Sequence, residues 1–225
     1  GIEAVDFLTS DTLWNIRVQP KRLVVLGGGP IGCELGQCFA RLGSQVTLVQ
    51  RPQRLLPKED PDASAAVQAA FEHEGITLAL GSEAIRIEKD GDGGRLIVRQ
   101  NGQERAIEFD RLLLALGRTA NVAGFGLEEL GVRVSAKGTV EADPLMRTTM
   151  PNILVCGDVT GPFQFTHVAA HQAWYAAVNA LFGPFWTFKV DYRVIPWATF
   201  TDPEVARVGL SETEATAQGI PFEVT

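Results

Sequence analysis

The chain is 225 residues long, enough for one domain of average size and part of a second, because domains mostly run to about 100–200 residues. Hydrophobic residues make up 45% and charged residues 21% of the chain, as in ordinary globular proteins, so wholesale disorder and a fibrous repeat are excluded. The net charge of −7 argues against a nucleic-acid partner, because binding to a phosphate backbone depends on clustered Lys and Arg.

Membrane and cysteine signals are absent as well. No apolar run approaches the roughly 20 residues that span a bilayer, and the first residues lack the layout of a signal peptide, so we expect a cytoplasmic protein without a membrane partner. The three cysteines are odd in number and form no Cys-x-x-Cys pair, which indicates neither a disulfide framework nor a zinc site. We expect Cys33, Cys38 and Cys156 to be inert packing residues.

The first predicted elements form a parallel crossover unit. Residues 22–26 and 45–50 are apolar runs typical of buried strands. Between them, residues 30–42 predict a helix, with Pro30 in the first turn, where proline is tolerated, and Gly43 just past the end. Strand, helix and strand within about 30 residues match the size of one βαβ unit.

A second helix and a meander are predicted next. Asp60 is placed as the N-cap of this helix, Pro61 opens it and Gly75 ends it. Further strands are predicted at residues 76–80, then at 83–89, 95–100 and 103–109 as an antiparallel meander with Gly, Asp and Asn turns, and at 111–115.

The second half of the chain has fewer clear elements. Residues 120–138 are a connector punctuated by glycine, and residues 152–156 predict an apolar strand that ends at Gly157-Asp158, where a second nucleotide-type site is suggested. Residues 167–182 have a helical pattern, which Gly183 and Pro184 stop. From Asp191 onward the apolar pairs resemble strands.

Residues 27–32, Gly-Gly-Gly-Pro-Ile-Gly, fit the G-x-G-x-x-G pattern between a predicted strand and a predicted helix, which is the context this motif requires. In the pattern Gly27 permits the tight turn, Gly29 lets the backbone approach a pyrophosphate, and Gly32 lets the helix pack close to the strand. The unpaired N–H groups and the positive dipole end of the helix then face the pyrophosphate. We therefore predict a dinucleotide site here.

The end of the second strand indicates which dinucleotide binds. A carboxylate about 20 residues after the glycines normally holds the ribose 2′-OH, but this strand ends in Gln50 and Arg51, with Arg54 nearby. Guanidinium groups match the charge and the acceptor oxygens of a 2′-phosphate, which a carboxylate would repel. NADP is therefore favoured over NAD, the alternative being that the arginines only solvate a loop.

Six segments together carry a family resemblance. They are Leu8-Thr9-Ser10-Asp11, the glycine-rich run 27–37, Ala-Leu-Gly-Arg-Thr-Ala-Asn at 115–121, Ile-Leu-Val-Cys-Gly-Asp at 153–158, Phe-Thr-His-Val-Ala at 165–169, and Phe-Thr-Asp-Pro-Glu-Val-Ala-Arg-Val-Gly at 200–209. In this order and spacing the sequence resembles the pyridine nucleotide-disulphide oxidoreductase family, in particular class I members of the dihydrolipoamide dehydrogenase and mercuric reductase type.

The resemblance implies an α/β fold with a Rossmann-like NAD(P)-binding domain, built from a parallel sheet and an antiparallel meander. It assigns residues 1–9 to the end of an FAD-domain segment and residues 10–119 to the NAD(P)-binding domain. Residues 120–188 would be the C-terminal part of the FAD-binding domain, and residues 189–225 the start of an α+β dimerisation domain.

The same resemblance implies roles for individual residues. Glu34 would help to position the reacting rings near the nicotinamide and the flavin, the alternative being a helix residue paired with a neighbouring Lys or Arg. Asp158 would hydrogen-bond the ribityl chain of FAD, the alternative being an ordinary turn aspartate. The remaining cofactor-binding residues would be Gly27, Gly29, Pro30, Ile31, Gly32, Cys33, Gln50, Arg51, Ala84, Ala115, Gly117, Arg118, Gly157, Thr166, His167 and Val168. His167 and His171 are i, i+4 but lack a third ligand, so we expect no metal site.

The family's first FAD-binding segment, its redox-active cysteine pair and its C-terminal His-Glu pair have no counterpart in this sequence. Cys33 and Cys38 are one residue too far apart for the cysteine pair. We therefore expect an internal portion of a longer, homodimeric enzyme, inactive by itself, that passes hydride from NAD(P)H to FAD and electrons on to a disulphide or another small acceptor. The alternatives are a non-catalytic dinucleotide-binding module, or an NADH oxidase-like flavoenzyme without the redox disulphide.

Overall fold

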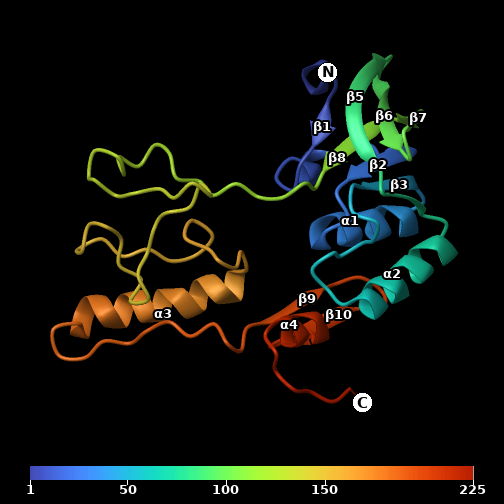
Figure 1. Ribbon diagram of the computed structural model, residues 1–225. Coiled ribbons are helices and arrows are strands. Elements are labelled where there is room, and N and C mark those ends of the chain that lie inside the picture. The colour runs from blue at the N-terminus through green and yellow to red at the C-terminus, as the bar shows by residue number, and fades with distance from the viewer. Residues whose placement is uncertain (225) are drawn as a thin grey trace. The chain divides into compact units, whose positions relative to one another are not determined.

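The computed structural model describes residues 1–224 (Figure 1). They fall into two compact units, one made of Gly1–Gly117 with the segment that begins at Ala198, and one made of Arg118–Trp197. Each unit is described by itself.

The first unit is built on a parallel sheet. Its five strands lie in the order β1 (Phe7–Leu8), β8 (Arg111–Leu114), β2 (Arg22–Leu26), β3 (Gln45–Gln50) and β4 (Thr77–Leu80), and every neighbouring pair is parallel. The chain therefore runs from β2 to β3 on one side and returns on the other side as β8. This reversal of strand order is the point where open α/β sheets bind their ligands.

Each face of the parallel sheet is covered by a different layer (Figure 1). Leu23 and Val25 of β2 pack in a hydrophobic cluster with residues of α1 (Pro30–Arg41) and α2 (Pro61–His73). Val24 and Leu26, which point to the opposite face, pack in a second cluster with residues of the antiparallel sheet β5 (Glu83–Asp90), β6 (Gly93–Gln100) and β7 (Gln103–Phe109). Burial on both faces explains the nearly continuous apolar run of β2. The predicted α/β fold with a parallel sheet and a meander is confirmed.

Shorter elements complete this unit. Near the N-terminus lie the 3-10 helices η1 (Ile2–Ala4) and η2 (Leu13–Asn15). Towards the C-terminus β9 (Pro196–Thr199), which crosses the boundary between the units, pairs with β10 (Val205–Val208), and α4 (Glu212–Ala217) follows.

The side chain of Asp60 caps a different helix from the one predicted. Asp60 occupies the N-cap position of α2, as expected, but its side chain makes no capping bond there. Its carboxylate accepts the backbone N–H of Glu212 at 2.9 Å and the hydroxyl of Thr213 at 2.6 Å, so it binds the first turn of α4. A residue distant in sequence thus fixes the C-terminal segment to the first unit.

Among its described residues the second unit has one long helix, α3 (Thr166–Phe182), together with turns, loops, isolated β-bridges and the first residues of β9. Of the 17 residues of α3 only Val168, Gln172 and Asn179 are buried. Within residues 1–224, both clusters of buried hydrophobic residues belong to the first unit. The buried hydrophobic residues of the second unit, which are Val132, Val140, Met146, Val168 and Ile195, belong to neither cluster.

The strand predicted at residues 152–156 is wrong. Leu154 forms only an isolated bridge with Arg147, and the backbone N–H of Val155 donates to Met146 at 2.9 Å. The apolar run meets one short partner instead of a sheet, and Ile153, Leu154 and Val155 are only half-buried. Apolar character alone therefore did not specify a strand.

Within the described part of the chain no helix combines the length and the apolar character needed to cross a bilayer.

Candidate functional site

The glycine turn after β2 lies at the reversal of strand order in the parallel sheet. Gly27 has a φ of +115°, a conformation that favours glycine, and its N–H donates to the carbonyl of Val49 at 2.9 Å. A Cβ at this position would lie 2.3 Å from the backbone oxygen of Ala115, which follows β8. Folding itself therefore requires glycine here.

Gly32 and Gly29 differ in what surrounds them. A Cβ on Gly32 would lie 1.9 Å from the carbonyl oxygen of Gly27, so this glycine lets α1 approach the turn. A Cβ on Gly29 would have no atom within 4 Å, and the φ of Gly29 is −81°, which any residue adopts. Neither packing nor backbone conformation requires glycine at position 29, so the open space beside it is suited to a ligand.

The N-terminus of α1 faces this open space with unpaired donors. Gly29 is the N-cap and provides no side-chain cap, and Pro30 is the first helical residue. The amides of Ile31 and Gly32 lie in the first turn, where helix geometry leaves N–H groups without intrahelical partners. Together with the helix dipole they form a site for an anion such as a pyrophosphate.

Gln50, at the end of β3, is tied to the glycine turn. Its Oε1 accepts the N–H of Gly28 at 2.9 Å, and the residue is 8% exposed. Because a backbone N–H can only donate, the amide oxygen must face Gly28 and the NH₂ group must face away. The sequence predicted Gln50 as a site residue but did not reveal this bond.

The two arginines near Gln50 differ. Arg51 is exposed, and within residues 1–224 its guanidinium forms neither a hydrogen bond nor an ion pair with the protein. Arg54 donates to the carbonyl of Pro57 at 3.1 Å and so supports its own loop. Of the two, Arg51 is therefore the one available to a ligand.

Glu34 is held by a residue that sequence reasoning missed. Its Oε1 accepts the backbone N–H of Phe200 at 2.9 Å. The expected alternative, a pairing with Lys or Arg, is not what the structure shows. Phe200 belongs to a segment that supported the resemblance, but nothing in the spacing indicated contact with α1.

Cys33 is an inert packing residue. It is fully buried, and its thiol donates to the carbonyl of Gly28 at 3.5 Å. Burial, together with the nearby charge of Glu34, raises the pKa of this thiol to about 12. A nucleophilic role needs a thiolate, which this environment disfavours.

The other predicted dinucleotide residues are partly gathered here. Ala115 donates its N–H to Leu26 at 2.8 Å and so lies beside the turn, and Gly117 follows it exposed to solvent. Ala84 is exposed near the start of β5, in the antiparallel sheet. Arg118 begins the second unit.

In the second unit, Gly157 and Asp158 form a turn held by Gln172 of α3. The buried Gln172 accepts the Gly157 N–H at 2.6 Å and donates to the carbonyl of Gly161 at 2.7 Å. The half-exposed carboxylate of Asp158 lies 3.4 Å from the guanidinium of Arg118, which also donates to the carbonyl of Gln164 at 2.9 Å. Asp158 and Arg118 are thus brought together, with Gln172 as a support that the sequence did not indicate.

The N-terminus of α3 contains Thr166, His167 and Val168. Its N-cap, Phe165, provides no side-chain cap, so the first amides of the helix lack intrahelical partners. Thr166 and His167 are exposed, whereas Val168 is buried. The backbone of this turn is suited to a ligand with negative charge or acceptor atoms.

The i, i+4 histidines of α3 bond the backbone. His167 Nε2 lies 2.6 Å from the carbonyl of Pro196, and His171 Nε2 lies 2.8 Å from the carbonyl of Asp191. Among residues 1–224 no group of three or more His, Cys, Asp or Glu side chains is arranged to hold a metal ion.

Comparison with known proteins identifies the family. Residues 1–173 match the model of the pyridine nucleotide-disulphide oxidoreductases, and residues 195–225 match the dimerisation domain of the same family. The chain is 43% identical over 219 residues to a mercuric reductase of Bacillus cereus, covering 97% of the chain and 34% of that protein. It is 39% identical over 218 residues to a dihydrolipoyl dehydrogenase of Chlamydia muridarum, covering 97% of the chain and 45% of that protein.

Solved structures give the same result. LpdA of Mycobacterium tuberculosis superposes with a TM-score of 0.84 at 29% identity, over 94% of this chain and 45% of that one. The HOCl-induced flavoprotein disulfide reductase RclA of Escherichia coli superposes with a TM-score of 0.84 at 30% identity, over 97% of this chain and 49% of that one. The chain thus spans between a third and half of the length of these relatives. It belongs to the pyridine nucleotide-disulphide oxidoreductase family.

Proposed function

We propose that the chain is the dinucleotide-binding portion of an FAD-dependent NAD(P)H oxidoreductase, together with part of its flavin-binding domain. In the whole enzyme, hydride passes from NAD(P)H to FAD, and electrons continue to a disulphide or another small acceptor. The observation that carries the proposal is the open space beside Gly29, a glycine that neither packing nor conformation requires. A pyrophosphate in contact with the backbone would account for it.

Different residues around the glycine turn bind different parts of the dinucleotide. Gly29 and the first-turn amides of α1 hold the pyrophosphate. Gln50 and Arg51, at the end of β3, lie on the adenosine side. Ala115 and Gly117 follow β8 and so lie on the nicotinamide side, because β8 and β3 flank β2 on opposite sides. Glu34 of α1 is proposed for the same side on the strength of the family resemblance.

We propose NADP as the preferred dinucleotide. The oxygen of the Gln50 amide is used by Gly28, so its NH₂ group is the part that can meet the ribose. A donor at this position suits the acceptor oxygens of a 2′-phosphate, and the unpaired guanidinium of Arg51 adds a matching charge.

The second unit is proposed to contribute to FAD binding. The turn of Gly157 and Asp158 offers a carboxylate to the hydroxyl groups of the ribityl chain, and the first turn of α3 offers N–H groups to the flavin ring. Bound FAD would supply two-electron acceptance from the dinucleotide, while the protein sets the geometry of the rings. The same proposal places domain boundaries after residues 9, 119 and 188, where the sequence predicts them.

We also propose a homodimer for the whole protein, which the match of residues 195–225 to the dimerisation domain supports. The mercuric reductase and dihydrolipoyl dehydrogenase relatives support an electron acceptor of the metal-ion or disulphide kind. We also predict a cytoplasmic location for the whole protein.

Titration of the chain with NADPH and NADH tests the proposal. We expect both to bind and NADPH to bind more tightly. The variant Arg51→Ala should weaken binding of NADPH roughly tenfold and change binding of NADH little, because it removes one charge-assisted contact to the 2′-phosphate. Arg105→Ala, which removes an exposed arginine from the antiparallel sheet, is the matched control and should change neither affinity.

Three results would count against the proposal. Tighter binding of NADH would refute the preference for NADP, and equal losses in Arg51→Ala would show that this side chain never touches the 2′-phosphate. Binding of neither dinucleotide would refute the site.

A further inference from the structure

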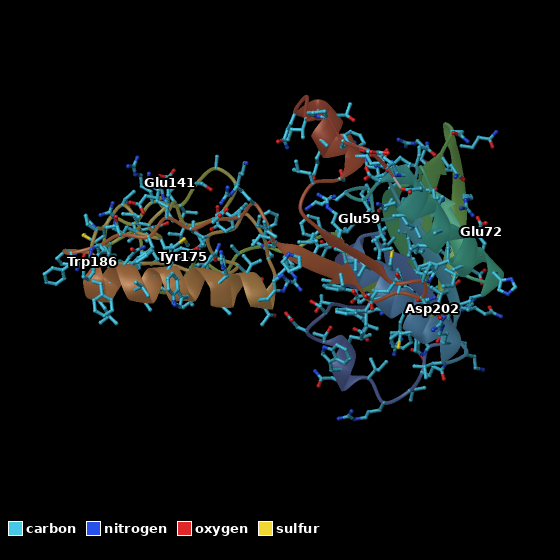
Figure 2. The ribbon with its side chains drawn as sticks, turned by 90° about the horizontal axis from the view of Figure 1, so that it is seen from below. Glu59, Glu72, Glu141, Tyr175, Trp186 and Asp202 are labelled. Carbon is cyan, nitrogen blue, oxygen red and sulfur yellow. The ribbon has the colours of Figure 1, made fainter. Side chains whose placement is uncertain are left out.

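Three side chains on one face of α1 hold the turn that follows β9. Glu34, Gln37 and Arg41 are spaced i, i+3 and i+7 and therefore share a helix face. All three bond the segment Phe200–Asp202, and Figure 2 labels Asp202 at the tip of the hairpin of β9 and β10. This segment lies in the part of the chain that matches the dimerisation domain, whereas α1 directly follows the glycine turn.

Gln37 makes the most closely fitted of these contacts. Its Nε2 donates to the carbonyl of Asp202 at 2.8 Å and its Oε1 accepts the N–H of Asp202 at 2.8 Å. Nε2 also donates to Glu74 at 2.9 Å, and the residue is only 4% exposed. A buried amide that satisfies both backbone groups of one residue holds that residue in a single place, because any shift would leave buried polar groups unpaired.

The ion pair of Arg41 with Asp202 contributes less to this fixation. Its nitrogen and oxygen are 2.7 Å apart, but the side chains are 48% and 72% exposed. Exposed pairs of this kind contribute little, since water and salt screen them. Gln37 therefore sets the position of the turn.

The position of the Phe200–Asp202 segment determines the orientation of the Glu34 side chain. The N–H of Phe200, two residues before Asp202, donates to Glu34 Oε1 at 2.9 Å. If the turn moves, this carboxylate loses the donor that fixes it. Gln37 and Glu34 are thus connected through a segment more than 160 residues away in sequence.

We infer that Gln37 is a positioning residue of the dinucleotide site: through the Phe200–Asp202 turn it holds the Glu34 carboxylate in place for the nicotinamide end of the cofactor. The inference rests on the proposed function. It also gives the start of the dimerisation segment a part in the dinucleotide site.

The test compares whole dinucleotides with their adenosine halves. The 225-residue chain is titrated with NADPH and 2′,5′-ADP, and with NADH and 5′-AMP. The variant Gln37→Met keeps the size of the side chain and removes both bonds to Asp202. It should weaken binding of the dinucleotide roughly threefold to tenfold and leave binding of the adenosine half unchanged, because only the nicotinamide end is affected.

A double-mutant cycle shows whether Gln37 acts through Glu34. Glu34→Ala should weaken binding of the dinucleotide but not of the adenosine half. Adding Gln37→Met to Glu34→Ala should weaken dinucleotide binding no further. Gln100→Met, which removes a 2.7 Å bond to the carbonyl of Leu80 in the same unit, is the matched control and should change neither titration. If Gln37→Met fails to fold by circular dichroism, Gln37→Lys replaces it, because an ammonium group can still donate to Glu74 and to the carbonyl of Asp202 but cannot accept the N–H of Asp202. A smaller loss, again confined to binding of the dinucleotide, is then expected.

Several outcomes would overturn the inference. They are parallel losses for the dinucleotide and the adenosine half, no loss for either, or additive losses in the double mutant. These outcomes leave the proposed function intact as long as the wild-type chain binds. If the unmodified chain binds none of the four ligands, the proposed function fails and the inference fails with it.

Discussion

The amide of Gln50 illustrates how much a single residue can hide from sequence reasoning. Its place at the end of β3 follows from the strand pattern and from its distance from the glycines. Its bond to Gly28 could not be predicted, because that bond depends on the rotamer that the packed sheet allows. The bond matters chemically, since it decides that the NH₂ group faces away from Gly28 and is the part left for the proposed ligand.

The three cysteines give a prediction at the same scale. Cys33 is buried, but Cys38 and Cys156 are exposed, so the expectation that these two are packing residues is wrong. A thiol reagent at pH 8 should therefore modify two thiols in the folded chain and three in denaturant. Counting modified sites by mass spectrometry checks this. Modification of Cys33 in the folded chain, at the rate of the other two, would contradict the buried environment described above.

The raised pKa of Cys33 also has a consequence for stability. The unfolded thiol ionises near its ordinary pKa of about 8.5, whereas the folded thiol keeps its proton up to about 12. Since the unfolded state then binds fewer protons than the folded state, stability falls as pH rises between these values. The loss should be smaller in Cys33→Ala, measured by urea unfolding against pH.

At the scale of elements, Asp60 gives a test of how the C-terminal segment is attached. Asp60→Ala removes the acceptor for the first turn of α4 and should lower the free energy of unfolding by about 1 kcal/mol, a typical value for a lost helix cap. The control is Asp62→Ala, because within the described residues the Asp62 carboxylate bonds only the neighbouring N–H of Ala63, at 2.8 Å. Equal losses would contradict the capping role.

The effect of Asp60 depends on pH in a defined direction. The hydroxyl of Thr213, followed by backbone N–H groups of α4, lowers the pKa of Asp60. A lowered pKa stabilises the folded chain above the unfolded pKa, and the contribution disappears as pH falls through the folded value. The difference between wild type and Asp60→Ala should therefore be present at pH 7 and vanish in acid.

Elements with regular apolar spacing were predicted well. The bounds of β2, β3 and β7 match the expected strands, and α1 and α2 begin where proline and the capping pattern indicated. In the second unit the apolar run at 152–156 misled, because strand formation also needs a neighbouring strand. Contacts such as Gln37 with Asp202 were out of reach, since they join segments that only the tertiary fold brings together.

At the scale of the whole molecule, the two units differ in packing. Both hydrophobic clusters of the described residues lie in the first unit, whereas α3 in the second unit leaves Trp174, Leu181 and Phe182 exposed. Amides of the second unit should therefore exchange with solvent orders of magnitude faster than those of β2 and β3. Hydrogen exchange with mass spectrometry checks this, and equal protection in both units would contradict it.

The distinction between Gly29 and the other glycines of the motif gives the most direct test of the dinucleotide site. Gly29→Ala adds a methyl group to space that no protein atom fills, so the chain should fold normally and lose NADPH binding by tenfold or more, roughly the loss of one or two strong contacts. Gly36→Ala, on the same helix with its nearest neighbours at 3.8 Å, makes the same change away from the turn and should bind as wild type. Calorimetric titration of both variants with NADPH decides: loss in Gly29→Ala alone supports the site, and unchanged binding in Gly29→Ala would contradict it.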